Sequence, residues 1–477
     1  PMTGGELMIG VRSPALWSPG QRSPTRGHAC WNLLESPKAQ SQPSTKNDET
    51  MHHSCRSISF GNAMSINNSR FLRRSALTLV ALASVFLLAS AGSAADPSGW
   101  YGFRGDGTGA GIDGPDKLVL GDRGNLAWKR PMPGKSVASP IIVGDRVIST
   151  SSGGQEGEKL FVTAVRLSDG ELLWEQSFRA TGRPFCHPTS ANAAPSPVSD
   201  GERIFAFYSS NDLICLSLDG ELIWYRGLGY DYPKAGNDIG MASSPIVTQG
   251  AVIAQIEAQG DSFAIGIDAE TGENLWRMDR PRQSNWSSPV AVMRPDESTE
   301  VVMQCGQSIV AVDPRSGNEK WSIQEGRDTI SSATPAGGLL LIPGDDMMAL
   351  DVGQSATAPE VAWRKNRVVP SNASAVVAGD RFYSLKGSVL IAASIEDGDV
   401  LWQERLSGLG GTWATPVYAD RKIYVFDQSG NGMVIEDRGD SAETISEVEI
   451  GEGVLASPAI AQGRLVVRSN DSLFCFE

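Results

Sequence analysis

Two segments, Asp268-Ala-Glu-Thr-Gly-Glu-Asn-Leu-Trp276 and Asp313-Pro-Arg-Ser-Gly-Asn-Glu-Lys-Trp321, share one pattern: an acidic residue, a turn with glycine, and a short strand that ends in tryptophan. Looser copies of the pattern end at Trp174, Trp224, Trp363 and Trp402. The six tryptophans are 50, 52, 45, 42 and 39 residues apart. A period of about 40–50 residues with strand-like units indicates a repeat architecture built from four-stranded blades.

A second signal, Ser-Pro or Thr-Pro, stands in phase with the first. The dipeptides begin at residues 139, 196, 244, 288, 334, 415 and 457, and Ser374-Ala375 takes their place once. A short run of alternating apolar and polar residues follows each one. Proline can open such a strand because the first residue need not donate a ladder hydrogen bond. The eight openings predict eight blades.

The eighth blade is incomplete in sequence order. Residues 472–477 correspond to the third strand of a blade, and no tryptophan strand follows them. Near the other end of the chain, Asn125-Leu-Ala-Trp128-Lys129 is a tryptophan strand with no blade before it. We therefore expect an all-β, eight-bladed β-propeller over residues 122–477, with the N-terminal strand closing the last blade. Each tryptophan should bury its ring against the adjoining blade.

The residues before the repeats predict an exported protein. Residues 1–63 are rich in Ser, Pro, Asn and Gln and predict a disordered or non-native extension. Residues 64–95 have the basic start, apolar run and small-residue exit of a secretory signal peptide. We expect a periplasmic or extracellular protein, with an uncleaved N-terminal membrane anchor as the alternative. Residues 96–121 should form an N-terminal segment that is flexible around Gly105–Gly111.

Charge and cysteine usage exclude several classes of function. Residues 96–477 carry a formal net charge of −19, which repels nucleic acid and anionic membranes. We expect the acidic stretch 436–452 to form a solvated face. No CxxC motif or adjacent cysteine pair occurs after residue 95, so a metal site built on sulfur is not expected. Cys215 and Cys475 lie in apolar strands and should be buried free thiols.

The Asp-x-x-Thr/Ser-Gly-x-x-x-Trp units resemble the PQQ repeat, and they cover nearly all of residues 122–477. The segment Trp100-Tyr-Gly-Phe-Arg-Gly105 resembles the start of exported bacterial PQQ-repeat propellers of undefined role. The resemblance implies two branches. One contains the PQQ-dependent alcohol dehydrogenases, and the other contains the propeller subunit of the outer-membrane β-barrel assembly machinery, which binds no quinone.

The chain departs from the dehydrogenase branch in its site residues. Those enzymes resemble one another in an adjacent Cys-Cys pair over the quinone, a calcium site and a catalytic aspartate. No two cysteines are adjacent here, and residues 96–477 are too few for the long insertions of those enzymes. We therefore transfer no catalytic, cofactor or metal residue, and we expect neither PQQ nor calcium.

Two connections between blades are longer than the others and carry the candidate binding residues. Trp174 to Pro197 spans 23 residues and Trp224 to Pro245 spans 21, against 12–14 elsewhere. These two loops should lie side by side on one face, as functional loops on a rigid fold do. The candidate binding residues are Arg183, His187, Tyr230, Tyr232, Lys234, Asn237 and Asp238. The single histidine after residue 95 does not favour a His-based triad or metal site.

These observations favour a binding scaffold over an enzyme. We expect an exported monomer that binds an envelope protein or peptide through its loop face or a sheet edge. One alternative is a PQQ-dependent alcohol or sugar oxidoreductase that uses the central mouth of the ring. Another is carbohydrate binding, because Tyr232, Trp286 and Trp413 stand near the predicted loop face.

Overall fold

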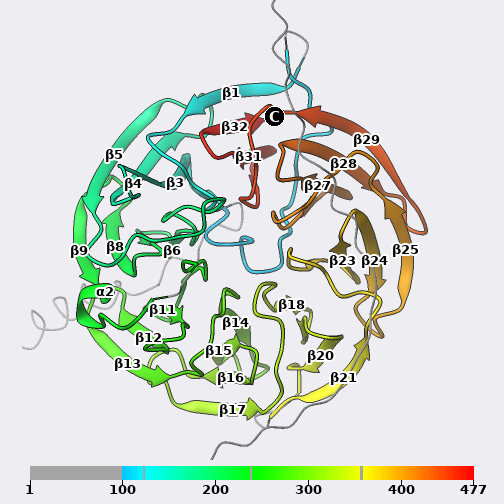
Figure 1. Cartoon of the computed structure of the whole chain (residues 1–477). Helices are drawn as coiled ribbons and strands as arrows, with labels where there is room; N and C mark the ends of the chain where they lie inside the picture. Colours follow the sequence, from blue (N-terminus) through cyan, green and yellow to red (C-terminus); the bar gives the residue numbers. More distant parts are fainter. Residues whose placement is uncertain (1–98, 122–123, 237–238, 355–357) are drawn as a thin grey trace, which may run out of the picture. The chain divides into compact units, whose positions relative to one another are not determined.

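Eight four-stranded antiparallel sheets surround a common axis in the computed structural model (Figure 1). The structure describes residues 99–121, 124–236, 239–354 and 358–477. All of them fall within one compact unit, Val85–Glu477. The eight-bladed β-propeller predicted from the repeats is therefore confirmed. The expected extension 1–63 and signal peptide 64–95 lie outside the described residues.

Each blade contains four strands that follow one another from the axis to the rim. The first four blades are β2 (Ile141–Val143), β3 (Arg146–Gly153), β4 (Lys159–Arg166) and β5 (Leu172–Arg179); β6 (Val198–Ser199), β7 (Arg203–Phe207), β8 (Asp212–Ser217) and β9 (Leu222–Gly227); β10 (Ile246–Thr248), β11 (Ala251–Ile256), β12 (Phe263–Asp268) and β13 (Asn274–Asp279); and β14 (Val290–Met293), β15 (Thr299–Gln304), β16 (Ile309–Val312) and β17 (Glu319–Ile323). One short helix in the described chain, α2 (Leu228–Asp231), follows β9.

The next three blades repeat this order. They are β18 (Thr334–Ala336), β19 (Leu339–Ile342), β20 (Met347–Asp351) and β21 (Glu360–Lys365); β22 (Val376–Ala378), β23 (Arg381–Lys386), β24 (Val389–Ser394) and β25 (Val400–Arg405); and β26 (Val417–Ala419), β27 (Lys422–Phe426), β28 (Asn431–Asp437) and β29 (Ala442–Glu449). Strand β29 forms the rim of the seventh blade without a tryptophan, as the sequence indicates.

The last blade joins the two ends of the repeat region. It holds β30 (Ala459–Ala461), β31 (Arg464–Arg468) and β32 (Ser472–Phe476), and β1 (Leu126–Pro131) adds the rim strand. Strand β1 pairs antiparallel with β32, so that Trp128 lies opposite Cys475 and Lys129 opposite Phe474. The predicted closure of the ring by the N-terminal strand is confirmed.

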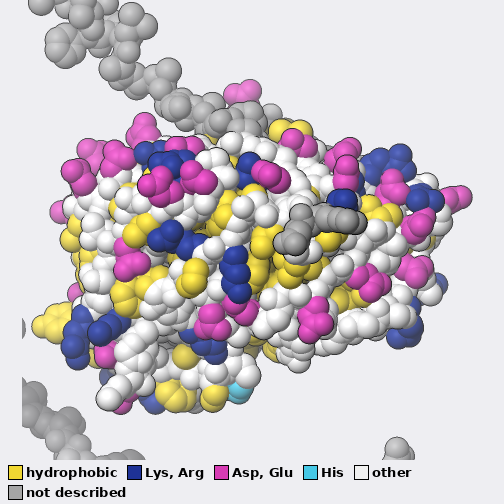
Figure 2. Space-filling model, turned by 90° about the horizontal axis from the view of Figure 1, so that it is seen from above, with side chains coloured by type: hydrophobic (Ala, Val, Ile, Leu, Met, Phe, Trp, Pro, Cys, Tyr) yellow, Lys and Arg dark blue, Asp and Glu magenta, His cyan; other side chains and the backbone are white. Residues whose placement is uncertain are grey.

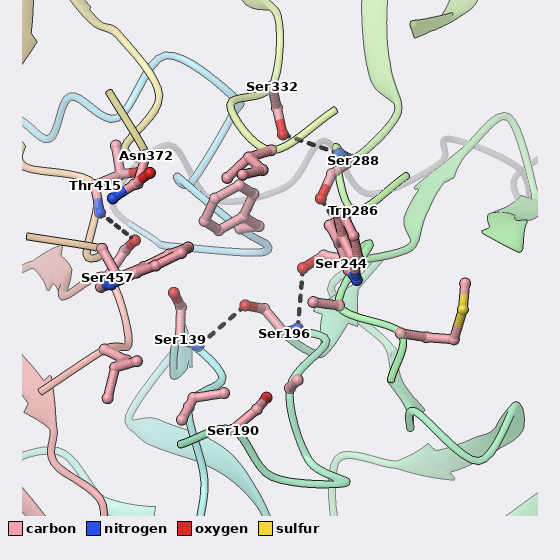
Figure 3. Close-up of a pocket in the computed structure, with 18 of the residues that line it drawn as sticks. Ser139, Ser190, Ser196, Ser244, Trp286, Ser288, Ser332, Asn372, Thr415 and Ser457 are labelled. Atoms are coloured by element: carbon pink, nitrogen blue, oxygen red, sulfur yellow. Dashed lines mark hydrogen bonds between the residues drawn. The ribbon is translucent and has the colours of Figure 1, made fainter. Parts of the chain in front are cut away.

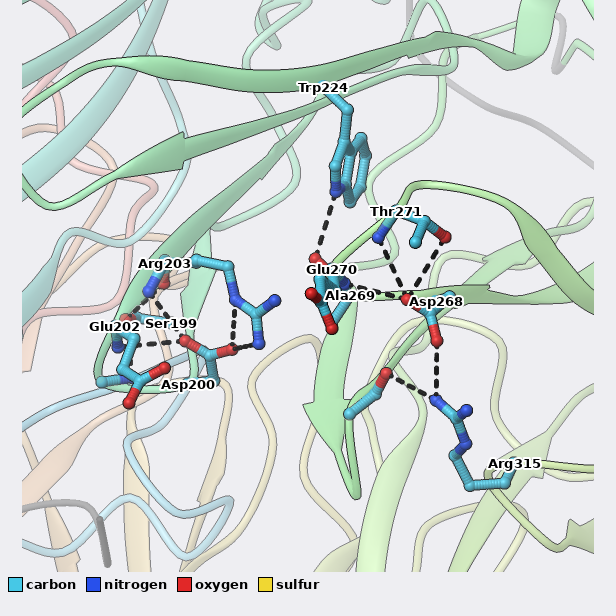
Figure 4. Close-up of polar contacts among 12 residues, drawn as sticks. Ser199, Asp200, Glu202, Arg203, Trp224, Asp268, Ala269, Glu270, Thr271 and Arg315 are labelled. Carbon is cyan, nitrogen blue, oxygen red and sulfur yellow. Dashed lines mark hydrogen bonds and ion pairs between the residues drawn. The ribbon is translucent and has the colours of Figure 1, made fainter. Parts of the chain in front are cut away.

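The rim tryptophans dock on the turn of the next blade (Figure 4). The indole Nε1 of Trp224 donates to the main-chain oxygen of Ala269 at 3.1 Å. A Cβ added to Gly272, whose φ is +74°, would lie 2.8 Å from the Trp224 ring. In the same turn, the Asp268 carboxylate accepts the backbone N–H of Glu270. The repeat motif thus encodes a tight turn, and the glycine of this turn leaves room for the tryptophan ring of the preceding blade to pack against it.

The same donation recurs around the ring. The Nε1 atoms donate to main-chain oxygens in the pairs Trp128 to Leu167 (2.8 Å), Trp174 to Leu218 (2.9 Å), Trp276 to Pro314 (2.9 Å) and Trp363 to Ile395 (2.8 Å). This bond satisfies the one polar atom of an otherwise buried apolar ring. The tryptophans therefore fix the angle between neighbouring blades as well as burying apolar surface.

Two tryptophans find a carboxylate in place of the backbone oxygen. Trp321 donates to Glu300 Oε2 at 2.7 Å within its own blade, and Trp402 donates to Asp437 Oδ1 at 3.1 Å in the next blade. Asp437 also accepts from the Tyr383 hydroxyl at 2.5 Å and is 5% exposed. The expectation that the stretch 436–452 forms a solvated face is therefore wrong at Asp437. Its carboxylate lies between the sixth and seventh blades, where Tyr383 and Trp402 of the sixth blade donate to it.

The inner strands supply the core between blades. In the cluster between the second and third blades, Phe205 and Cys215 pack with Val252 and Ile265. Cys215 and Cys475 are buried free thiols, as predicted. Burial raises the pKa of the Cys215 thiol to about 12, and an un-ionised buried thiol behaves as a small apolar side chain.

Residues 100–115 form a strap across the middle of the ring (Figure 1). Trp100 exchanges two backbone hydrogen bonds of 2.8 Å with Ile142, at the axial edge of β2. Further along, the Thr108 oxygen accepts the Val377 N–H of β22 at 2.9 Å. Gly111 donates its N–H to the Tyr418 oxygen of β26 at 2.8 Å. The strap therefore caps the inner edges of the first, sixth and seventh blades.

The expected flexibility of Gly105–Gly111 is wrong, because this stretch is part of the strap and packs closely against the inner strands of the ring. A Cβ added to Gly111 would lie 2.6 Å from the Ile460 side chain, so the backbone runs where no larger residue fits. Arg104 precedes the stretch and is 2% exposed. It donates to Thr334 Oγ1 at 2.6 Å and to the Ala333 oxygen at 2.7 Å. Burial lowers the pKa of Arg104 to about 10.

Candidate functional site

A cavity of about 450 Å³ lies on the axis, where the inner ends of the blades converge. Phe103 of the strap lines it, as do His187 and Ile239 from the two long loops. The strap forms backbone hydrogen bonds with the innermost strands, close to the hairpin turns within the blades. The two long loops leave from the opposite ends of the blades. We call this hollow the axial cavity. It opens toward the loop face, and the strap lies at its other end.

A ring of hydroxyl groups encircles the axial cavity (Figure 3). The ring consists of Ser139, Ser196, Ser244, Ser288, Ser332, Ser374, Thr415 and Ser457, one from the start of each blade. Going round from Ser139 to Ser457, the backbone N–H of each residue donates to the hydroxyl oxygen of the next, over seven bonds of 2.8–3.1 Å. We call this set the hydroxyl ring.

The hydroxyl ring keeps its own protons available. A serine or threonine hydroxyl can accept and donate at the same time. Seven of the eight oxygens receive a backbone N–H, and within the described chain none of the eight hydroxyls donates to a protein acceptor. All eight side chains are at most 6% exposed. The ring therefore presents O–H donors around a partly enclosed space.

The remaining wall of the axial cavity is mostly aromatic and apolar, and its polar members are His187, Thr189, Ser190 and Asn372. Trp286 is held by donation from its Nε1 to the Gly240 oxygen at 2.8 Å, and Trp413 is 44% exposed beside the opening. No Asp, Glu, Lys or Arg of the described chain lines the cavity. Among the described residues, no group of three His, Cys, Asp or Glu could hold a metal ion. The cavity is thus suited to an uncharged ligand with hydrogen-bond acceptors and an apolar face.

The two long loops lie side by side, as predicted. The His187 N–H donates to the Ile239 oxygen at 2.9 Å, which ties the first loop to the second. The Met241 N–H donates to the Ser209 hydroxyl at 2.8 Å and so anchors the second loop to its own blade. The His187 imidazole is exposed, with Nδ1 2.8 Å from the Thr189 hydroxyl. These bonds make the loops a fixed wall beside the cavity.

Of the predicted binding residues that the structure describes, His187 is the one that lines the axial cavity. Arg183 lines a neighbouring hollow of about 610 Å³, and its guanidinium lies 4.5 Å from the centre of the Phe185 ring. Tyr230 is 79% exposed on α2. Lys234 is exposed, and its backbone oxygen accepts the Asp261 N–H at 3.0 Å.

Tyr232 packs away from the axial cavity. Its ring centre lies 4.7 Å from that of Phe263, and its hydroxyl accepts the Asn274 side-chain amide at 3.1 Å. Asn237 and Asp238 lie outside the described residues. The candidate set is therefore divided between the cavity, the neighbouring hollow and the outer part of the second loop.

The hydroxyl ring is the part of the site that sequence reasoning missed. Part of its signal was present, because six of the eight members are the first residue of a Ser-Pro or Thr-Pro dipeptide and Ser374 opens the Ser-Ala pair that replaces one. The dipeptide at Thr334 is shifted by two residues relative to the ring, where Ser332 takes part instead. Partners in the ring are 41 to 57 residues apart, so no local pattern reveals the contact. Phe103 was missed as well, because it belongs to the strap, and the repeat pattern of the blades does not include the strap.

Comparison with known proteins agrees with this architecture. A family model described as outer membrane protein assembly factor BamB matches residues 89–224 and 158–338, which together span more than half of the chain. The BamB of Bordetella pertussis is 24% identical over 350 residues, covering 70% of this chain and 81% of the relative.

Two solved structures show the same fold. BamB from Moraxella catarrhalis has a TM-score of 0.54 at 16% identity, covering 74% of this chain and 97% of its own. A europium-containing methanol dehydrogenase has a TM-score of 0.60 at 11% identity, covering 80% of this chain and 98% of its own. At these identities the structural likeness concerns the fold alone. The family model carries the assignment further: this chain belongs to the PQQ-like β-propeller family of the outer membrane protein assembly factor BamB.

Proposed function

We propose that this protein is an exported, non-catalytic scaffold that binds a protein or peptide partner of the cell envelope through its loop face. Membership of a family described by an outer membrane protein assembly factor supports this role. The partner would be a protein that assembles at the outer membrane. Among the described residues, no helix is both long enough and apolar enough to cross a bilayer.

The observation that carries the proposal is the set of apolar side chains exposed on the two long loops. Phe185 is 45% exposed, Tyr230 79% and Ile239 47%. Backbone bonds hold the two loops together, so little ordering entropy would be lost when a partner binds. Arg183 stacks over Phe185 at the edge of this surface. Aromatic residues and arginine dominate the energy of protein interfaces.

On the side of the ring seen in Figure 2, charge does not mark a competing surface. Figure 2 shows acidic and basic side chains interspersed over the wall seen there, with apolar side chains between them. A mixed surface of this kind produces no large field of one sign. The exposed apolar residues of the loops, rather than a charged patch, would therefore select the partner.

A quinone cofactor does not fit the axial cavity and is not part of the proposal. PQQ is a polycarboxylate, and calcium is bound by several oxygen ligands that include carboxylates. Within residues 99–121, 124–236, 239–354 and 358–477, the lining offers neither an Arg or Lys cation for the quinone nor a carboxylate for the metal. We expect PQQ and calcium chloride to leave the unfolding temperature unchanged. A ligand-dependent rise would contradict this part of the proposal.

Partner capture tests the main proposal. The purified protein is immobilised, envelope extract is applied, and each captured protein is identified, purified and measured again for binding. We expect one defined envelope protein whose affinity falls at least tenfold in the double variant Phe185→Ser, Tyr230→Ala. Val361→Ser is the matched control, because Val361 is 43% exposed on β21, outside the loops. Equal affinity in all three proteins would overturn the loop-face assignment.

A further inference from the structure

The axial cavity combines features that a protein-docking loop face does not need. It is a partly enclosed hollow with a circle of free O–H donors and aromatic walls, and no Asp, Glu, Lys or Arg among the described residues lines it. We propose that it is a second binding site, and that its ligand is the terminal ring of a neutral saccharide. The proposal stands independently of the protein partner at the loops.

The hydroxyl ring supplies the polar half of the recognition. Because seven of its oxygens already accept a backbone N–H, their protons can be turned toward the axis. A pyranose carries hydroxyl and ring oxygens around its whole circumference, so a circular set of donors can meet several of them at once. Buried O–H groups without a protein acceptor gain most when a ligand satisfies them.

The aromatic wall supplies the apolar half. Trp286 and Trp413 border the cavity on the loop side, and Phe103 reaches it from the strap. The Trp286 ring is fixed by its bond to Gly240, so it offers a preformed flat surface. The C–H faces of a sugar ring pack on such surfaces, because these faces are apolar and the aromatic face is electron-rich.

In the part of the chain that the structure describes, no Asp, Glu, Lys or Arg lines the cavity, and this favours neutral sugars as ligands. Placing a carboxylate or phosphate in the cavity would remove its hydration without a cation to replace it. Uronic acids, sugar phosphates and charged peptide ends should therefore bind much more weakly than neutral sugars. Hydroxyl donors alone offset this cost only in part.

The strap determines which part of a saccharide can enter. Residues 100–115 lie across the end of the axis away from the loops, held by backbone bonds to β2, β22 and β26 and by the buried Arg104. A glycan chain then cannot thread through the ring. The cavity, at about 450 Å³, lies within the usual range of roughly 300–1,000 Å³ for small-molecule sites. It would hold a free sugar or the end of a chain.

The test uses the full protein and neutral sugars as probes. Glucose, galactose, mannose, N-acetylglucosamine and the disaccharides of glucose and N-acetylglucosamine are titrated by indole fluorescence and calorimetry, beside glucuronate as the charged analogue. We expect at least one neutral sugar to bind with a dissociation constant in the millimolar range or tighter. Glucuronate should bind at least tenfold more weakly. If no neutral sugar binds, the proposal is overturned.

Two variants locate the binding in the cavity. Trp413→Ala removes an exposed ring at the opening and should weaken binding at least tenfold. Ser139→Ala removes one hydroxyl of the ring and should weaken binding several-fold. In the described chain no backbone N–H donates to the Ser139 hydroxyl, so this variant keeps the seven bonds between blades. Met293→Ala, 75% exposed on β14 away from the cavity, is the control and should bind as the parent protein does.

The remaining outcomes also decide the question. Sugar binding that is unchanged in both Trp413→Ala and Ser139→Ala places the site elsewhere and overturns the proposal. Binding of an uncharged apolar peptide with no sugar response would assign the cavity to protein docking. Because partner capture depends on Phe185 and Tyr230, and sugar binding on Trp413 and Ser139, failure of one proposal leaves the other measurable.

Discussion

Replacing Gly272 by alanine tests whether the packing of the Trp224 ring on this glycine holds neighbouring blades together. The new Cβ would lie 2.8 Å from Cδ2 of Trp224, and the backbone φ is +74°. A left-handed backbone costs a residue with a side chain about 1–2 kcal/mol. Overpacking a well-packed core costs about 1–3 kcal/mol more. We therefore expect the free energy of unfolding to fall by about 2–5 kcal/mol.

Urea unfolding, followed by tryptophan fluorescence and circular dichroism, measures this loss. Gly379→Ala is the matched control, because its φ is +62° and no atom lies within 4 Å of the added Cβ. It should lose only the backbone part, about 1–2 kcal/mol. The difference between the two variants then isolates the contact with the indole ring. Equal losses in both would refute the argument that the ring is packed against the glycine.

Three further predictions concern charged side chains. Asp437→Asn should lower the free energy of unfolding by about 1–3 kcal/mol, because it weakens the acceptor of Trp402; urea unfolding identical to that of the parent would contradict this. The backbone N–H of Thr271 holds the pKa of Asp268 below its ordinary value, so its stabilising effect is present above that value and lost as pH falls through the lowered pKa. Acid unfolding of Asp268→Asn should therefore show a shallower pH dependence than the parent, and an unchanged slope argues against the role of this turn. Arg104→Ala should cost about 2–5 kcal/mol by leaving a cavity and unpaired acceptors, while Arg104→Met should recover part of it; thermal unfolding ranks the three proteins, and a fully stable alanine variant would show that the arginine is dispensable.

The repeats made most of the fold predictable. Each blade repeats the same local contacts, so the period of the tryptophans and the Ser-Pro openings fix the number of strands and their order. The closing strand was predictable because Trp128 has the pattern of a rim strand and residues 472–477 lack one. The two long loops were predictable as neighbours, since they leave consecutive blades at the same end.

The contents of the central space were not predictable, because the contacts there are long-range and use ordinary residues. The Gly105–Gly111 stretch reads as flexible, yet its glycines are required by close backbone packing against side chains such as Ile460. Arg104 meets Thr334, which is 230 residues away. The hydroxyl ring likewise joins seven serines and one threonine that are far apart in the sequence, and no local pattern around any of them reveals the contact. The burial of Asp437 was not predictable, because the acidic residues around it in the sequence indicate a solvated stretch.

The pairing of β1 with β32 makes completion of the fold depend on a strand that is synthesised after all the other strands of the ring. Strand β1 and the strap leave the ribosome before any blade, yet their partners include residues 472–476 and Tyr418. Contacts between residues so distant in sequence form slowly, and until they form the strand edges that they will cover stay open to other chains. We therefore expect a vulnerable, unclosed intermediate whose lifetime governs the yield of folded protein. A ring gains its freedom from exposed edges only at the final step of its assembly.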